Sequence, residues 1–244
     1  MSSTSRTSLP STSVIGAAFD FNTGSPKVRI EYVVIHARLS RVSHYFDETP
    51  AVGSDEVVVD VALPDVGFTM VTDRGVFSRG HLDSGTSLLL RAAPPPSATG
   101  DLLDLGCGAG PIALTLALRS PNATVWAVDT NERARSLTER NCARNGIVNV
   151  RVCAPSDVPA DVRFSTIWSN PPIRIGKAQL RDLLAGWLGR LADDGEAVLV
   201  VQKHLGADSL QRWLTDESFP TERIASRGGF RLLRSTNEHT EPPT

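Results

Sequence analysis

Residues 101–111 read Asp-Leu-Leu-Asp-Leu-Gly-Cys-Gly-Ala-Gly-Pro, and they carry the clearest structural signal of the chain. The residues before the first glycine predict a buried strand. The three glycines that follow predict a turn in which the backbone can approach a ligand closely. Pro111 suits the first turn of a helix, where no amide hydrogen is needed, and such a helix directs its free N–H groups at the ligand. The segment therefore predicts a strand, a ligand-binding turn and a helix.

Beyond this segment the chain alternates between strand and helix patterns. Near-continuous apolar runs such as residues 196–202 are typical of parallel strands that are covered on both faces. Residues 223–234 predict a final hairpin centred on Gly228-Gly229. We therefore expect an α/β fold in which a mostly parallel, Rossmann-like sheet of seven strands carries helices on both faces. Strands are predicted at residues 101–105, 124–128, 149–153, 164–169 and 196–202, and helices at residues 111–119, 131–144, 177–192 and 206–216.

The region before the main sheet predicts two smaller elements. Alternating apolar runs at residues 56–63 and 67–73 predict a β-hairpin. A short helix is predicted between Asp83 and Ala93, with Asp83 or Ser84 as its N-cap.

The composition is that of an ordinary globular chain, with 41% of the 244 residues hydrophobic and 21% charged. We expect no membrane span and no secretory signal, because the chain has neither a long apolar run nor an apolar segment near its start. Cys107, Cys142 and Cys153 lack Cys-x-x-Cys spacing, which argues against a disulfide framework or a zinc site and favours a reducing cytoplasm. The net charge of −2 gives no overall indication of nucleic-acid binding.

Acidic residues near the strand ends give the glycine turn a specific ligand chemistry. Asp129 ends the second strand nineteen residues after Gly110, near the spacing at which a carboxylate accepts hydrogen bonds from ribose hydroxyls. A nicotinamide dehydrogenase shares these features, but its fingerprint needs Gly or Ala where this chain has Pro111. Asp104 precedes the turn, where a carboxylate can attract the ammonium of a methionine-derived cofactor. Asp157 follows the third strand, near an adenine amino group if the cofactor is adenylated, although a plain loop aspartate is the alternative. The candidate cofactor residues are therefore Asp104, Gly106, Cys107, Gly108, Gly110, Asp129 and Asp157.

Asn170-Pro171-Pro172 follows the fourth predicted strand and suggests a site for a planar amine. The Asn170 side-chain oxygen and the Pro171 carbonyl can accept the hydrogens of an exocyclic amine and orient its nitrogen. The prolines have a fixed φ, so they hold these oxygens in place at low entropic cost. We take Asn170, Pro171 and Pro172 as the catalytic candidates, while a simple turn after a strand is the alternative reading of the tripeptide.

These motifs together resemble those of the class I S-adenosylmethionine-dependent methyltransferases. More closely, the chain is similar to the small-subunit ribosomal RNA guanine-N2 methyltransferase family over residues 44–235. The shared pieces are His44-Tyr45-Phe46, Val76-Phe77-Ser78, Leu82-Asp83-x-Gly85-Thr86 and Ser169-Asn170-Pro171-Pro172. The resemblance implies a class I methyltransferase fold, S-adenosylmethionine as cofactor and N2 of a guanine as acceptor. It also implies that Thr86 lines the cofactor.

The resemblance implies a domain division and a partner. We expect an N-terminal extension at residues 1–43, largely disordered, and a disordered tail at residues 237–244. Between them a methyltransferase domain spans residues 44–236, with its hairpin and helix in 44–92 and its Rossmann-like core in 101–236. Larger family members carry an additional N-terminal domain, and this sequence has only residues 1–43 at the corresponding place. The implied partner is ribosomal RNA or the small ribosomal subunit, in the cytoplasm, with no metal and no membrane; the sequence does not indicate an oligomeric state.

The substrate side departs from the wider amine-methylating group, because Ile173 stands where an aromatic residue often follows Asn-Pro-Pro. Phe77 is a candidate for a stacking face instead, although a core phenylalanine is an equal alternative. Basic residues after the fourth and fifth strands can contact phosphates, and those of the last hairpin can extend the patch, although solvated surface arginines are common. The candidate substrate residues are Phe77, Ile173, Arg174, Lys177 and Lys203, with Arg181, Arg223, Arg227, Arg231 and Arg234 as possible extensions.

Three alternatives stay open. The chain could methylate a protein glutamine amide, although Ile173 and the motifs at 44–46 and 76–86 count against it. It could methylate a small-molecule amine, which the net charge does not exclude. It could also be a catalytically silent RNA-binding module with the same fold, but Asp104 and Asp129, which a decayed site would often lose, are both present.

Overall fold

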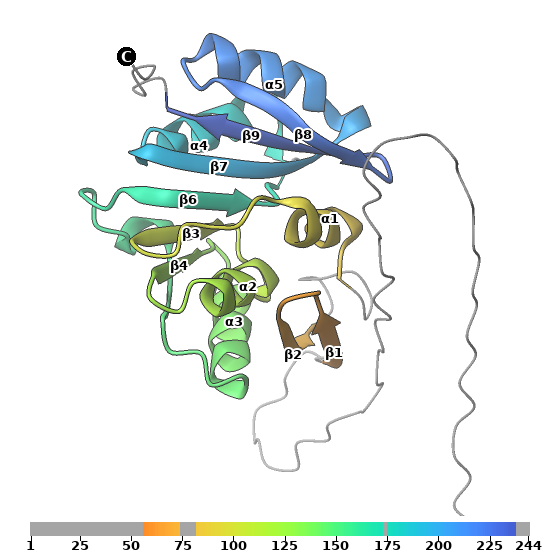
Figure 1. Cartoon of the computed structure of the whole chain (residues 1–244), viewed down its shortest axis with the longest axis vertical. Coiled ribbons are helices and arrows are strands. Elements are labelled where there is room, and N and C mark those ends of the chain that lie inside the picture. Colours follow the sequence, from red (N-terminus) through yellow and green to blue (C-terminus); the bar gives the residue numbers. More distant parts are fainter. Residues whose placement is uncertain (1–55, 74–81, 173–174, 238–244) are drawn as a thin grey trace, which may run out of the picture. The chain divides into compact units, whose positions relative to one another are not determined.

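The computed structural model describes residues 56–73, 82–172 and 175–237. Its main element is a seven-stranded sheet in the order β5-β4-β3-β6-β7-β9-β8 (Figure 1). Strands β3 to β7 run parallel, and β9 runs antiparallel to both β7 and β8. The sheet consists of β3 (Asp101–Leu105), β4 (Thr124–Val128), β5 (Val150–Cys153), β6 (Phe164–Ser169), β7 (Leu191–Gln202), β8 (Thr221–Arg227) and β9 (Phe230–Thr236). The predicted mostly parallel seven-stranded sheet is confirmed.

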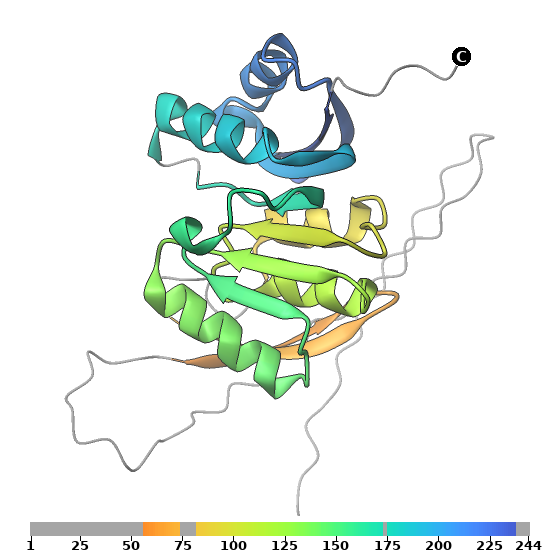
Figure 2. The same ribbon diagram turned by 90° about the vertical axis from the view of Figure 1, so that its left-hand side faces the viewer.

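Helices cover both faces of this sheet (Figure 2). Leu102 contributes to the hydrophobic cluster on one face and Leu103 to the cluster on the other, because successive strand side chains point to opposite sides. Burial on both faces explains the apolar strand sequences. One cluster includes residues of α1 (Ser84–Ala92), α2 (Pro111–Arg119) and α3 (Glu132–Arg144), and the other those of α4 (Lys177–Leu188) and α5 (Ala207–Asp216).

The strand order reverses between β3 and β6. The chain leaves β3, adds β4 and β5 on one side, and then returns to place β6 on the other side of β3 (Figure 1). In open α/β sheets ligands bind at the carboxyl ends of the strands beside such a switch point. The glycine turn after β3 and the Asn-Pro-Pro segment after β6 therefore flank the expected ligand position.

The ends of four parallel strands lie in one row. Ser169 of β6 pairs with Leu105 of β3, Leu105 with Val128 of β4, and Val128 with Cys153 of β5. The Ser169 hydroxyl also donates a 2.7 Å hydrogen bond to the Leu105 carbonyl, and Ser169 is fully buried. This bond fixes the two strand ends from which the glycine turn and the Asn-Pro-Pro segment leave.

The predicted hairpin, β1 (Val57–Ala62) and β2 (Gly67–Thr72), packs against α3. Asn141 and Asn145, four residues apart and so on one face of α3, bond the backbone of β2 through their side-chain amides. Asn141 accepts from the Val71 amide at 2.7 Å and donates to the Val71 carbonyl at 2.9 Å. Asn145 makes the same pair of bonds to Thr69, at 3.0 and 2.8 Å. The two asparagine side chains thus bond backbone N–H and C=O groups of β2 that a neighbouring strand would otherwise bond.

Two adjoining predicted boundaries were wrong. The helix predicted at residues 177–192 ends at Leu188, and β7 begins at Leu191 rather than at residue 196. Gly189 is the C-cap of the helix, and its N–H donates a hydrogen bond to the Ala185 carbonyl. Gly195 then lets β7 approach β6, because a Cβ there would lie 2.5 Å from the Phe164 carbonyl oxygen. The polar residues before Gly195 concealed this first part of the strand. The N-terminal extension, predicted at residues 1–43, lies outside the described residues.

Candidate active site

The glycine turn is tied to the end of β4 and to α3. The amides of Gly106 and Cys107 both donate to the Val128 carbonyl, at 2.8 and 3.0 Å. At Gly110, with a φ of 90°, a Cβ would lie 2.8 Å from the Thr138 methyl, so only glycine lets the turn pack on α3. Gly106 has a φ of 80° and no atom within 4 Å of the Cβ position, so its backbone is open on that side. One glycine therefore serves packing and the other leaves room for a ligand.

Asp104 is a buried carboxylate with spare hydrogen-bonding capacity. It is fully buried, and its Oδ2 accepts a 2.9 Å hydrogen bond from the Ala113 amide in the first turn of α2. Its Oδ1 has no hydrogen-bond partner among the described residues. Burial raises the pKa of Asp104 from 3.8 to about 8, and the nearby charge of Asp129 adds to the rise. A buried acceptor without a donor is rare in folded proteins, so Oδ1 suits a cationic donor from a ligand.

The two other candidate carboxylates follow the next strands of the row. Asp129 is half-buried after β4 and accepts from the Gly108 amide at 3.0 Å and from the Asn131 amide at 2.8 Å. Asp157 is exposed, in a short 3-10 helix (Pro155–Asp157) after β5, and it bonds the Ser156 hydroxyl and the Ala154 amide. The structure therefore brings Asp129 directly to the glycine turn, while Asp157 lies one strand farther out.

Only the nitrogen end of the Asn170 side-chain amide is hydrogen-bonded by described residues. Its Nδ2 donates to Asp83 Oδ2 at 2.9 Å and to Thr86 Oγ1 at 3.0 Å. No described residue donates a hydrogen bond to Asn170 Oδ1 or to the Pro171 carbonyl. Pro171 is buried and Pro172 is exposed. Two acceptor oxygens thus follow the end of β6 without a partner in the described part of the chain.

Asp83 also belongs to this site, through a contact with Asn170 that the sequence did not reveal. It is the N-cap of α1, as predicted, and its Oδ2 accepts from the amides of Gly85 and Thr86 at 3.0 and 3.1 Å. The same oxygen accepts from Asn170, 87 residues farther along the chain. Thr86, predicted to line the cofactor, accepts a hydrogen bond from Asn170 Nδ2 through its hydroxyl oxygen. The only sequence signal for Asp83 as a site residue was the motif that contains both Asp83 and Thr86.

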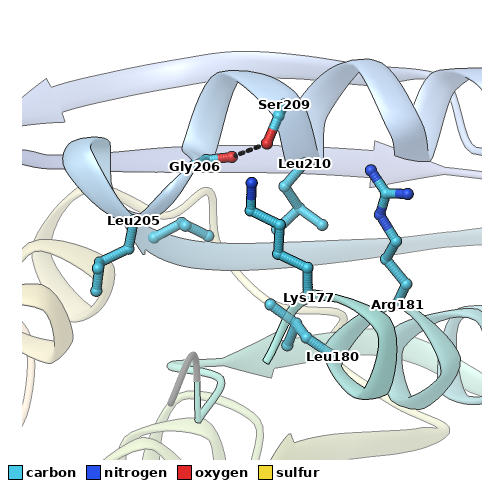
Figure 3. A pocket seen from close by; sticks show the side chains of 8 residues that line it. Lys177, Leu180, Arg181, Leu205, Gly206, Ser209 and Leu210 are labelled. Carbon is cyan, nitrogen blue, oxygen red and sulfur yellow. Dashed lines mark hydrogen bonds between the residues drawn. The ribbon is translucent and has the colours of Figure 1, made fainter. Parts of the chain in front are cut away.

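The predicted substrate residues lie in different places. Phe77, Ile173 and Arg174 lie outside the described residues. Lys177 lines a small pocket between α4 and α5, whose floor is apolar and whose rim also carries Arg181 (Figure 3). Lys203 follows β7 in a short 3-10 helix and does not line that pocket. The two lysines therefore line different pockets.

Lys203 instead lines an open groove beside the β8–β9 hairpin, which we call the hairpin groove. It is lined by Lys203, Arg223, Ser226, Arg227, Gly228, Gly229, Phe230 and Arg231. Arg231 pairs with Asp208, whereas no described carboxylate forms a salt bridge with Lys203, Arg223 or Arg227. Arg234 pairs with Glu196 and Glu222 and does not line the groove.

The hairpin groove adjoins the Asn170 site through Phe230. A Cβ on Gly85 would lie 2.8 Å from the Phe230 ring, so this ring packs against the first turn of α1. That turn also carries Thr86, which bonds Asn170. Across the described ranges, no group of three or more metal-ligating side chains occurs and no helix has the length and apolar character needed to cross a membrane.

Comparisons with known proteins agree on one family. The family model of the methyltransferase small domain matches residues 67–234. The chain is 34% identical over 195 residues to protein YbxB of Bacillus subtilis, covering 79% of this chain and 97% of that protein. It is 43% identical over 177 residues to ribosomal RNA small subunit methyltransferase C of Aeromonas hydrophila, covering 70% of this chain and 50% of that protein. The chain thus spans about half the length of the methyltransferase C relatives.

A solved structure shares the fold. It is the Thermus thermophilus 16S rRNA N2 G1207 methyltransferase in complex with AdoMet and guanosine, at a TM-score of 0.63 and 21% identity, over 78% of this chain and 53% of that one. The match of sequence and fold confirms the predicted family. The chain belongs to the methyltransferase small domain family and has the fold of an S-adenosylmethionine-dependent methyltransferase.

Proposed function

We propose that this chain transfers a methyl group from S-adenosylmethionine to N2 of a guanine in small-subunit ribosomal RNA. The observation that carries the proposal is the state of Asn170, whose Nδ2 is bound by Asp83 and Thr86 while its Oδ1 has no donor among the described residues. An exocyclic amine has two N–H donors and fits a pair of acceptors. Asn170 Oδ1 and the Pro171 carbonyl offer such a pair.

The residues around the glycine turn fit the cofactor. The unpartnered Oδ1 of Asp104 suits the ammonium of the methionine part, and Asp129 suits the ribose hydroxyls. The open backbone side of Gly106 leaves room for close approach, and Asp157 is the candidate for the adenine amino group. S-Adenosylmethionine supplies an electrophilic methyl group.

Catalysis at such a site depends on alignment of the amine. The amine of guanine is a weak nucleophile because its lone pair is delocalised into the ring. Asn170 and Pro171 would accept its hydrogens and favour a pyramidal nitrogen whose lone pair points toward the methyl donor. Both oxygens are too weakly basic to take up a proton, so the proton that methylation displaces would leave to solvent. No acid–base pair is required.

The hairpin groove supports RNA as the substrate class. Lys203, Arg223 and Arg227 have no ion-pair partner among the described residues, and the groove adjoins the Asn170 site. Phosphate contacts by such cations supply most of the affinity for nucleic acid and position it without reading its sequence. The relatives named ribosomal RNA small subunit methyltransferase C support ribosomal RNA in particular. We therefore place the activity in the cytoplasm.

The proposal is tested with labelled S-adenosylmethionine on transcribed small-subunit ribosomal RNA, reconstituted small subunits and a ribosomal protein fraction. We expect label in RNA and N2-methylguanosine in its nucleoside digest. Asn170→Ala should keep cofactor affinity by calorimetry and lose at least about 100-fold in turnover, as for other transition-state hydrogen bonds. Asn122→Ala, at an exposed asparagine outside the site, is the control. Label in the protein fraction, another methylated nucleoside or full activity of Asn170→Ala would refute the proposal.

A further inference from the structure

We propose that Asp83 and Thr86 are positioning residues that fix the side-chain amide of Asn170 in one of its two orientations. In that orientation Oδ1, and not Nδ2, faces the acceptor amine. The inference rests on the proposed function, because it assumes that this site receives an exocyclic amine. It assigns a role to the N-cap residue of α1 and to a residue of its first turn, both of which would act on the amine through Asn170.

An asparagine amide needs such a device because its two ends have nearly the same shape. Rotation by about 180° exchanges the oxygen and the nitrogen, and the torsion concerned is broad and roughly two-fold. If Nδ2 faced the substrate amine, two hydrogen-bond donors would meet and the amine would lose a hydrogen-bond acceptor. The catalytic value of Asn170 therefore depends on which end points outward.

Asp83 decides the orientation because a carboxylate can only accept. With the amide as observed, Asp83 Oδ2 receives a hydrogen from Asn170 at 2.9 Å. With the amide reversed, Asn170 Oδ1 would lie against that carboxylate oxygen and the two acceptors would repel. Thr86 strengthens the hold on Nδ2 through a second hydrogen bond at 3.0 Å, and the residue is only 3% exposed, so water does not readily replace it.

Asp83 and Thr86 are themselves held rigidly. Asp83 caps α1 through the amides of Gly85 and Thr86, and its negative charge is favourable at the positive end of the helix. Leu89 and Leu90 of the same helix are fully buried against the sheet. The orientation of Asn170 is thus set by a helix that is anchored in the core, rather than by a mobile loop.

The variants separate this role from a structural one. Thr86→Val removes the hydroxyl at nearly constant shape and should lower kcat about fivefold, the usual value of one neutral hydrogen bond, with little change in KM for RNA. Thr86→Ser restores an acceptor and should recover most of the loss. Asp83→Ser keeps an N-cap but puts a hydroxyl, which donates as well as accepts, beside Asn170, and should lower kcat about tenfold to 100-fold. Thr166→Val, at a buried hydroxyl near the start of β6, should leave kcat unchanged.

Two readouts make the test decisive. In the Asn170→Ala background, Thr86→Val should cause no further loss of kcat, because Thr86 acts through Asn170. By ¹⁵N NMR without substrate, the Asn170 side-chain NH₂ should exchange with solvent more slowly than that of exposed Asn122, and this protection should fall in Thr86→Val. The NMR readout does not need activity, so it still tests the positioning role if the wild-type chain methylates no RNA and the proposed function fails.

Several results would overturn the inference. Fast exchange of the Asn170 NH₂ in the wild-type protein is one, and an equal kcat loss from Thr86→Val with and without Asn170 is another. A weaker affinity for S-adenosylmethionine in Thr86→Val, with the Asn170 signals unchanged, would instead return Thr86 to the predicted cofactor role.

Discussion

Replacement of Asn141 by alanine should destabilise the domain severely. The side chain is fully buried on α3 and makes three hydrogen bonds. It accepts from the Val71 amide at 2.7 Å and donates to the carbonyls of Val71 and Ala109 at 2.9 and 2.8 Å. It therefore joins three segments that are far apart in the sequence: β2, the glycine turn and α3.

The size of the effect follows from what the substitution leaves behind. Asn141→Ala removes the partners of one N–H and two C=O groups on Val71 and Ala109, which are 3% and 0% exposed. An unsatisfied buried polar group costs about 1–3 kcal/mol, so three of them predict a loss of about 3–5 kcal/mol after partial relaxation. That is a large part of the roughly 5–15 kcal/mol that stabilises a typical domain.

Urea unfolding of the full chain, followed by circular dichroism, measures this loss. Asn145→Ala is the matched control, because it removes similar bonds to Thr69 at a half-buried position that water can reach, and it should cost about 1 kcal/mol. Calorimetry with S-adenosylmethionine should show weaker binding for Asn141→Ala, since Ala109 belongs to the glycine turn. A loss below about 1 kcal/mol for Asn141→Ala, or equal losses for both variants, would refute the reasoning.

Two further predictions concern charge. Because the pKa of Asp104 is raised to about 8 in the folded protein, the folded state keeps a proton that the unfolded chain releases near pH 4. Without cofactor the free energy of unfolding should therefore fall as pH rises from about 4 to 8, by up to about 1.4 kcal/mol per pH unit. Asp104→Asn should lack this component. An equal dependence of the unfolding free energy on pH in both proteins, measured by urea titrations, would contradict the prediction. In the hairpin groove, combined Arg223→Gln and Arg227→Gln should weaken RNA binding and lower the slope of log affinity against log salt by about 1.4–1.8, whereas Arg91→Gln with Arg144→Gln on exposed helix positions should not. An unchanged salt slope would exclude the groove from RNA binding.

The local elements of this protein were readable from its sequence. The glycines and Pro111 indicated the turn and the helix start, and an apolar strand pattern preceded them. Asp83 was recognisable as a cap because capping depends on residues two and three positions away. The helix end at Leu188 was missed, because the polar residues before Gly195 hid the start of β7.

The contacts within the site came only from the tertiary structure. Asn170 meets Asp83 and Thr86 across more than eighty residues, and Asn141 meets Val71 across seventy. Lys177 and Lys203, which the sequence predicted for one basic patch, line different pockets.

The physical reason is the range of the interactions concerned. Strand and helix periodicity, glycine turns and caps act within a few residues, so the sequence alone determined the order of the elements and the position of the glycine turn. Side-chain hydrogen bonds between distant segments depend on the strand order, the register and the side of the sheet on which each helix packs. Those are properties of the assembled core, and they decided which end of Asn170 faces outward.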